Sequence, residues 1–135
     1  MNRLGFTPDM VGDQVFWEAC NKLPDFWITM PVMPGAHAYW AQIKHLNPPI
    51  LSGAPKSDFE RAERDKKQWW WDNFRHDNVI VCRSRDKQNW CHNPDDTLVD
   101  DKGYILKRWV KAGGCGILFR NFPQVLAEMK KLGIL

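Results

Sequence analysis

The sequence has no CxxC pair, no glycine-rich phosphate motif and no long apolar run. Without paired cysteines the usual zinc fingers and ribbons are excluded, because their ligands are spaced about two to four residues apart. The missing GxGxxG and Walker A patterns exclude the common nucleotide-binding loops. A membrane span needs roughly 18 or more consecutive apolar residues, and no stretch approaches that length.

Cysteines are few and far apart: Cys20, Cys82, Cys91 and Cys115. The amino-terminal residues lack the pattern of a signal peptide. We therefore expect a cytoplasmic protein with free thiols, since a reducing compartment disfavours disulfides. The even cysteine count leaves two disulfides as the alternative.

Bulky apolar residues are abundant, with eight tryptophans and seven phenylalanines among 135 residues. This length and a hydrophobic content of 44% predict one ordered domain over residues 1–135. The net charge is +3 and the sequence pI is about 8.7. This mildly basic balance permits an anionic partner, although dedicated nucleic-acid domains often have a pI above about 9.

The clearest helix signal covers Ser57 to Arg75, where three tryptophans adjoin a run of basic residues. Ser57 and Glu60 fit a capping box at its start. Helical periodicity predicts a buried stripe made of Phe59, Ala62, Trp69, Trp70 and Phe74. Lys66 falls inside this stripe, so we expect its ammonium to reach solvent or a partner.

A second face of this helix carries Arg64, Lys67, Trp71 and Arg75. One interpretation is an ordinary solvated surface, with Trp71 covered by a neighbouring loop. The other is a binding surface, because cations hold phosphate or acidic groups while an exposed indole stacks or anchors an interface. The solvent exposure of Trp71 decides between them.

The remaining segments predict an α+β fold. N-terminal helices and the central amphipathic helix pack on an antiparallel meander of three to five strands, and a C-terminal helix closes the chain. We expect helices over residues 7–23, 35–46 and 123–133, extended segments over 25–34, 78–84, 88–92, 97–99, 104–110 and 115–120, and a loop over 47–56.

Metal binding has two candidate sets, and simpler explanations account for both. Cys82, Cys91 and His92 are soft ligands, but their spacing does not match a zinc site, and small core residues explain the cysteines. The carboxylates Asp95, Asp96, Asp100 and Asp101, with His92 nearby, would suit magnesium or calcium, but turn chemistry also explains them. We predict no metal and no cofactor.

The run Gly113 to Gly116 surrounds Cys115 with small residues. Bare backbone amides beside a thiol can cradle an anion. A hairpin turn, in which glycines supply positive φ angles, is the simpler interpretation. No catalytic residue is predicted.

These observations favour a small non-enzymatic binding protein that contacts nucleic acid or a nucleoprotein assembly. If strands 78–84 and 104–110 are neighbours, one basic-aromatic patch contains Arg64, Lys67, Trp71, Arg75, Arg83, Arg85, Lys107 and Arg108. The alternative is a regulator or inhibitor, of the kind that viruses and mobile elements encode, binding an acidic protein surface. A small metal- or thiol-dependent enzyme is the second alternative.

Overall fold

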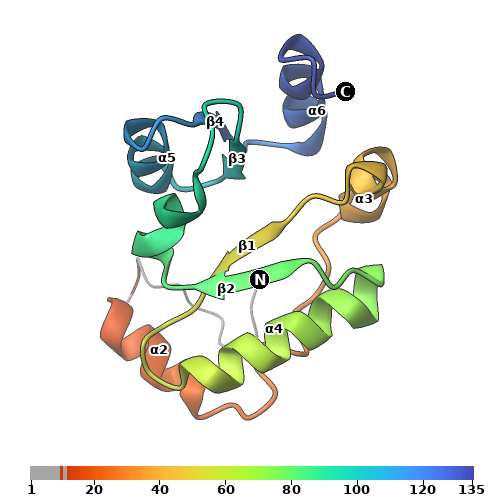
Figure 1. Cartoon of the computed structure of the whole chain (residues 1–135). Helices are drawn as coiled ribbons and strands as arrows, with labels where there is room; N and C mark the ends of the chain where they lie inside the picture. Colours follow the sequence, from red (N-terminus) through yellow and green to blue (C-terminus); the bar gives the residue numbers. More distant parts are fainter. Residues whose placement is uncertain (1–9, 11) are drawn as a thin grey trace.

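The strands of this protein pair in parallel. The computed structural model describes residue 10 and residues 12–135. Strand β1 (Ile50–Gly53) pairs with β2 (Val79–Cys82), and β3 (Thr97–Asp100) pairs with β4 (Cys115–Leu118), in two separate two-stranded sheets (Figure 1). The structure is 50% helical and 13% strand. The predicted antiparallel meander is therefore wrong.

Helical crossovers explain the parallel pairing. Helix α4 (Phe59–Phe74) connects β1 to β2, and α5 (Gly103–Lys111) connects β3 to β4. Parallel neighbours need such a crossover, whereas antiparallel strands are joined by short turns. Residues 104–110 were expected to form a strand, but they form most of α5. Its buried residues are Ile105, Leu106 and Trp109, at the spacing of one helical face.

Three further segments differ from the prediction. Residues 25–34 form turns and irregular backbone, with Phe26 and Trp27 buried in the core. Residues 88–90 belong to the 3₁₀ helix η2 (Ser84–Trp90), so the expected return strand is absent there. The expected loop over 47–56 contains β1. This strand has only four residues and is flanked by two prolines and by a further turn-forming sequence. Its apolar pattern is therefore too short to predict a strand.

The other helices are close to their predicted positions. Helix α3 (Ala36–Ile43) continues into η1 (Lys44–Leu46), and α6 (Phe122–Lys131) begins with a capping box formed by Asn121 and Gln124. Helix α4 starts at Phe59 after Asp58, without the predicted Ser57 side-chain cap. Helix α2 (Asp13–Asn21) follows the predicted cap at residues 7–9, which lies outside the described residues.

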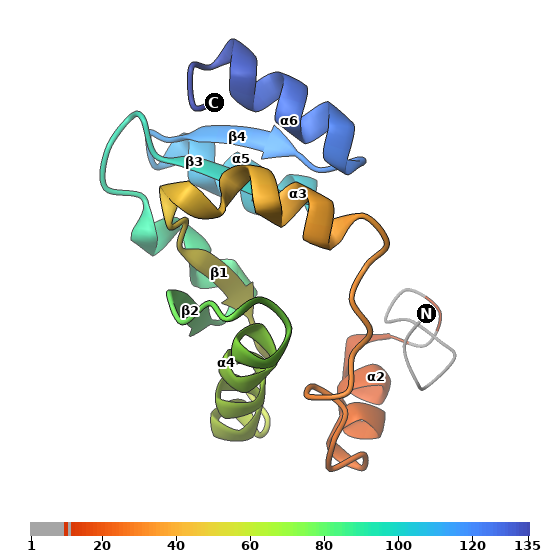
Figure 2. The same cartoon turned by 90° about the vertical axis from the view of Figure 1, so that its right-hand side faces the viewer.

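Two helical layers enclose the strands. Ile50 and Val99 pack against a cluster that includes residues of α3 and α6, while Leu51 packs with Leu98 against α5. Figures 1 and 2 agree that α5 lies on the opposite side of β3 and β4 from α3 and α6. Helix α4 covers β2 through Ala62. Successive residues of β1 and β3 therefore face opposite layers, as in parallel sheets covered on both sides.

None of the helices within residues 12–135 combines the length and apolarity needed to cross a lipid bilayer.

Candidate functional site

An open cavity of about 1480 Å³ lies where three strands end. Its walls include the residues at or just after the carboxyl ends of β1, β2 and β3: Gly53, Ala54, Arg83, Ser84, Asp100 and Asp101. We call this cavity the carboxyl-end pocket. Open α/β sheets bind ligands outside the carboxyl ends of their strands, at the point where the strand order reverses.

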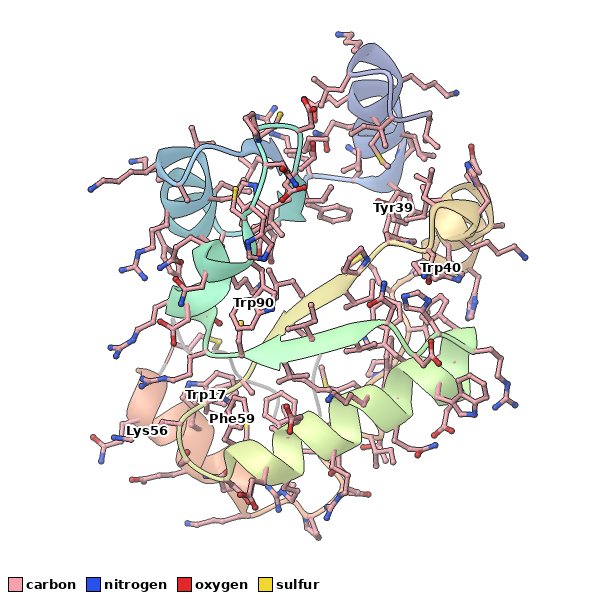
Figure 3. The ribbon with its side chains drawn as sticks, viewed as in Figure 1. Trp17, Tyr39, Trp40, Lys56, Phe59 and Trp90 are labelled. Carbon is pink, nitrogen blue, oxygen red and sulfur yellow. The ribbon has the colours of Figure 1, made fainter. Side chains whose placement is uncertain are left out.

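Helix α2 forms another wall of the carboxyl-end pocket. Trp17 and Glu18 come from this helix, and the Trp17 ring stacks on Trp27 with 5.7 Å between ring centroids. Figure 3 shows Trp17 and Lys56 on the side of the molecule where β1 and β2 end. An aromatic wall therefore lies beside the polar strand ends.

Lys66 reaches the pocket from the apolar stripe of α4, in which Ala62 is buried and Phe59, Trp69, Trp70 and Phe74 are partly buried. Its ammonium donates to the Ser52 hydroxyl over 3.1 Å and to the Gly53 carbonyl, and it lies 4.6 Å from the ring centroid of Trp27. Burial, reinforced by the positive charge of Lys87, lowers the pKa of Lys66 to about 8. The expected partner of the Lys66 ammonium is thus a set of neutral oxygen acceptors. Because these acceptors do not neutralise the ammonium, its positive charge is available to a ligand.

Lys87 and Asp100 form a buried ion pair beside Lys66. The Lys87 Nζ lies 2.7 Å from the Asp100 carboxylate, and both residues are buried. Asp100 also accepts the backbone N–H of Lys102 over 2.9 Å. Asp101, the next residue, is exposed at the pocket wall and pairs with no described residue. Of the three carboxylates that line the pocket, Asp100 is neutralised by Lys87, Glu18 accepts from the Gln14 amide, and Asp101 has no described partner.

Positive charge dominates the carboxyl-end pocket. Six basic and three acidic residues line it, an excess of three positive charges: Lys56, Lys66, Arg83, Arg85, Lys87 and Lys102, with Glu18, Asp100 and Asp101. Low-dielectric walls focus such a field and raise the local concentration of anions. The pocket is therefore suited to an anionic ligand.

Gly53 brings β1 unusually close to the start of η2. A Cβ atom at Gly53 would lie 2.1 Å from the Ser84 Oγ. Glycine allows this approach because it has no side chain. The Ser84 hydroxyl consequently lies beside the Gly53 backbone, at the point where Lys66 also binds.

The predicted basic-aromatic face of α4 is present. Trp71 is 45% exposed, and the Arg75 guanidinium lies 5.6 Å from its ring centroid. Arg64 is exposed and contacts Asp65, and the Lys67 ammonium lies 3.8 Å from Glu63. We call Arg64, Lys67, Trp71 and Arg75 the α4 outer face. Trp71 is thus open to solvent, as the binding interpretation required.

The other four predicted site residues do not form one patch in the expected way. Arg83 and Arg85 line the carboxyl-end pocket, and Arg108 donates to the Arg85 carbonyl over 3.2 Å. Lys107 is exposed on α5. The single patch depended on adjacent strands at 78–84 and 104–110, and the second of these is a helix.

The candidate metal ligands do not lie together in one site. Asp95 and Asp96 precede β3, whereas Asp100 and Asp101 end it. The Asp96 carboxylate accepts the backbone N–H groups of His92 and Asn93, and these hydrogen bonds lower its pKa. Across the described residues, no group of three or more His, Cys, Asp or Glu side chains is arranged to hold a metal ion.

All four cysteines are free. Cys82 is buried, and burial raises the pKa of its thiol. Gly113 has a positive φ of 105°, as the turn interpretation required, but the turn joins α5 to the parallel strand β4. It is therefore not the hairpin turn that the sequence suggested.

Sequence reasoning did not identify Lys66, Ser84 and Lys87 as pocket residues, or Ser52 as the hydroxyl that accepts from Lys66. Lys66 carried one signal, because a lysine inside an apolar helical stripe needs a partner. The others come from separate elements, and only the tertiary structure brings them together. Comparison of the chain with protein-family models, curated proteins and solved structures found no match for any part of it.

Proposed function

We propose that the carboxyl-end pocket binds the phosphate group of a phosphorylated small molecule. The observation that carries this proposal is the convergence of two lysines, the partly buried Lys66 and the buried Lys87, from different elements on one strand-end pocket. Phosphate is the common biological anion that takes several donors at once. Ser84 adds a hydroxyl donor in the pocket lining.

The surroundings of the lysines favour a small ligand with a ring system. Trp17 lines one wall and Tyr104 another, so an aromatic or sugar group attached to the phosphate would find apolar surface. Nucleotide bases stack on such side chains. A nucleoside monophosphate is therefore the first ligand class to test.

Asp101 extends the proposal to a divalent cation. Mg²⁺ commonly binds to one or two protein carboxylates together with the phosphate of a ligand. Asp101 is the carboxylate of this pocket that pairs with no described residue, whereas Asp100 pairs with Lys87 and Glu18 accepts from the Gln14 amide. We expect Mg²⁺ to tighten phosphate binding severalfold in the native chain and to have no such effect in Asp101→Asn, as measured by calorimetric titration. Equal Mg²⁺ effects in the two proteins would contradict this role.

The reaction class to assay is phosphoryl transfer. Catalysis of this reaction depends chiefly on positioning and on neutralising the charge of the phosphoryl group. The two lysines supply that neutralisation, and Asp101 supplies a metal ligand. Release of inorganic phosphate from nucleoside monophosphates, with and without Mg²⁺, is the direct assay.

Calorimetric titration with inorganic phosphate and a nucleoside monophosphate tests the binding proposal. Lys66→Met retains the length of the side chain and removes its charge. We expect a loss of affinity of about 10- to 100-fold, the range of a hydrogen bond to a charged group. The matched control is Lys67→Met, on the exposed side of the same helix. Equal affinities of the native protein and Lys66→Met would overturn the proposal.

The α4 outer face supports a second candidate function, the contact with nucleic acid or an acidic protein surface expected from the sequence. Its support is the exposed Trp71 with Arg75 over the ring. Nucleic-acid affinity should fall steeply between about 50 and 200 mM salt. The double variant Arg64→Glu, Arg75→Glu should abolish binding. Unchanged nucleic-acid and partner binding by this variant would exclude the face.

A further inference from the structure

Strands β1 and β3 each have an edge that pairs with no strand among the described residues. Each sheet contains two strands, and no hydrogen-bonded ladder joins β1 to β3. Purely parallel sheets are normally larger and are covered on both faces. Isolated parallel pairs within two helical layers therefore suggest an incomplete sheet.

The backbone hydrogen bonds show which groups lie on these edges. The N–H groups of Ile50 and Ala54 donate to β2-side carbonyls, so the alternate residues Leu51 and Gly53 direct their backbone groups away from β2. The carbonyls of Asp96 and Asp100 accept from Cys115 and Phe119. Thr97 and Val99 in β3 therefore direct their backbone groups away from β4.

The two edges belong to one layer of the molecule. Leu51 and Leu98 share the α5 side, and Ile50 and Val99 share the side of α3 and α6. Figures 1 and 2 both show β1 between β2 and the β3–β4 pair. The end of β1 and the end of β3 also open on the same pocket. The strand order is thus β2, β1, β3, β4, interrupted between its two central members.

We propose that an extended segment of a different polypeptide inserts between β1 and β3 as a parallel strand and joins the two pairs into one five-stranded sheet. Its backbone would pair with Leu51 and with the Gly53 N–H on one side, where the Gly53 carbonyl already accepts from Lys66, and with Thr97 and Val99 on the other. This proposal stands on the strand edges and does not rest on phosphate binding.

The surroundings define the chemistry of the inserted segment. Its residues would face helices on both sides, so a run of β-branched apolar residues fits, as is usual for central parallel strands. Its carboxyl end would enter a pocket with an excess of three positive charges, beside Lys66, which has no carboxylate partner among the described residues. Charge complementarity therefore calls for an acidic residue at that end.

A synthetic peptide tests this surface in the native chain. The probe has two lysines for solubility, four β-branched apolar residues and a terminal aspartate. Nuclear magnetic resonance follows the exchange of backbone amides on adding the peptide. We expect exchange at Leu51 and Val99 to slow by at least about tenfold, since both amides would gain hydrogen bonds. Exchange at Val81 and Leu118, on the outer edges of β2 and β4, should not change.

Two methylated peptides distinguish insertion from addition at an outer edge. A central strand uses every backbone N–H, alternately towards each neighbour, whereas an added edge strand uses alternate ones only. N-methylation of either of two adjacent central residues should therefore weaken binding by roughly two- to tenfold, the effect of losing one hydrogen bond. A peptide with lysine in place of aspartate should also bind more weakly.

The proposal is overturned if the peptide gives no saturable binding, or if protection appears at Val81 or Leu118 instead. Sensitivity to only one of the two methyl groups would also overturn it. Concentration-dependent protection of Leu51 and Val99 without peptide would identify a second copy of this chain as the occupant and would refute the different polypeptide. Protection by the peptide in a protein that binds no phosphate would leave this proposal intact and refute only the phosphate site.

Discussion

The carboxyl-end pocket and the α4 outer face both contain basic and aromatic residues, but the basic side chains of the two regions differ in solvent exposure and in their contacts. On the outer face Arg64, Lys67 and Arg75 are exposed: Arg64 contacts the buried Asp65 from the solvent side, Lys67 contacts Glu63, and Arg75 lies over the Trp71 ring. In the pocket Lys66 and Lys87 are withdrawn from solvent and fixed by hydrogen bonds. Exposed ion pairs contribute about 0–1 kcal/mol, whereas buried charges have large effects when a partner is lost. The same composition therefore predicts different consequences at the two places.

The largest effect is expected from removing Lys87. Lys87→Met leaves Asp100 buried without its cation, which should destabilise the protein by about 3–5 kcal/mol. Chemical denaturation measures this change, and calorimetric titration should show that phosphate binding is lost. The double variant Lys87→Met, Asp100→Leu should recover most of the stability, because apolar pairs often replace buried ion pairs without cost. It should not recover phosphate binding. A single variant as stable as the native protein would remove the contrast between the two regions.

Measurements over a series of pH values distinguish the two regions, with a smaller expected effect than the removal of Lys87. Lys66 has a folded pKa of about 8, below its ordinary value of 10.5. Between these values the unfolded chain binds more protons, so the contribution of Lys66 to stability increases as pH rises from about 8 to 10.5. Phosphate affinity should change in the opposite direction and fall roughly five- to tenfold between pH 7 and 9, as Lys66 loses its charge.

Lys66→Met is the control for this series. Without the ammonium, the opposing trends of stability and affinity above pH 8 should both disappear. Binding at the α4 outer face should change little over the same range, because its arginines keep their charge. An unchanged pH profile in Lys66→Met would show that another group titrates there.

The smallest effect is expected at Trp71. Because this side chain is 45% exposed, Trp71→Ala should change the free energy of unfolding by no more than about 0.5 kcal/mol. Trp40→Ala, at a buried position, should cost about 3–5 kcal/mol and provides the matched control. Thermal or chemical denaturation of both variants measures the difference. A loss of several kcal/mol at Trp71 would assign this residue to the core.

Local sequence patterns predicted the parts of the fold that depend on local interactions. Helix α4 and the position of Trp71 outside its apolar stripe follow from the spacing of residues within one helix, whereas the exposure of Trp71 did not follow from the sequence. The helix expected over residues 123–133 likewise corresponds to α6. These signals operate over three or four residues, so they survive without knowledge of the tertiary structure.

The sheet and the pocket depend on long-range pairing. Residues 104–110 are rich in aromatic and β-branched residues, which favours a strand, but burial of Trp109 with Ile105 stabilises the helix. Strand β1 has four residues and becomes recognisable only beside β2. The ion pair between Lys87 and Asp100 joins η2 to β3, and the close approach of Ser84 to Gly53 joins η2 to β1. No periodicity along the chain predicts these contacts.

The four free thiols differ in burial, so the rates at which they react can report local unfolding of the native protein. Cys20 is fully buried, and desolvation raises its pKa to about 11, while Cys82 is also buried. Cys91 and Cys115 are partly exposed. A thiolate is the reactive form, so an alkylating reagent should modify the exposed pair first. Delayed labelling of Cys20 would then time the separation of α2 from the body of the protein, and delayed labelling of Cys82 would time the fraying of β2.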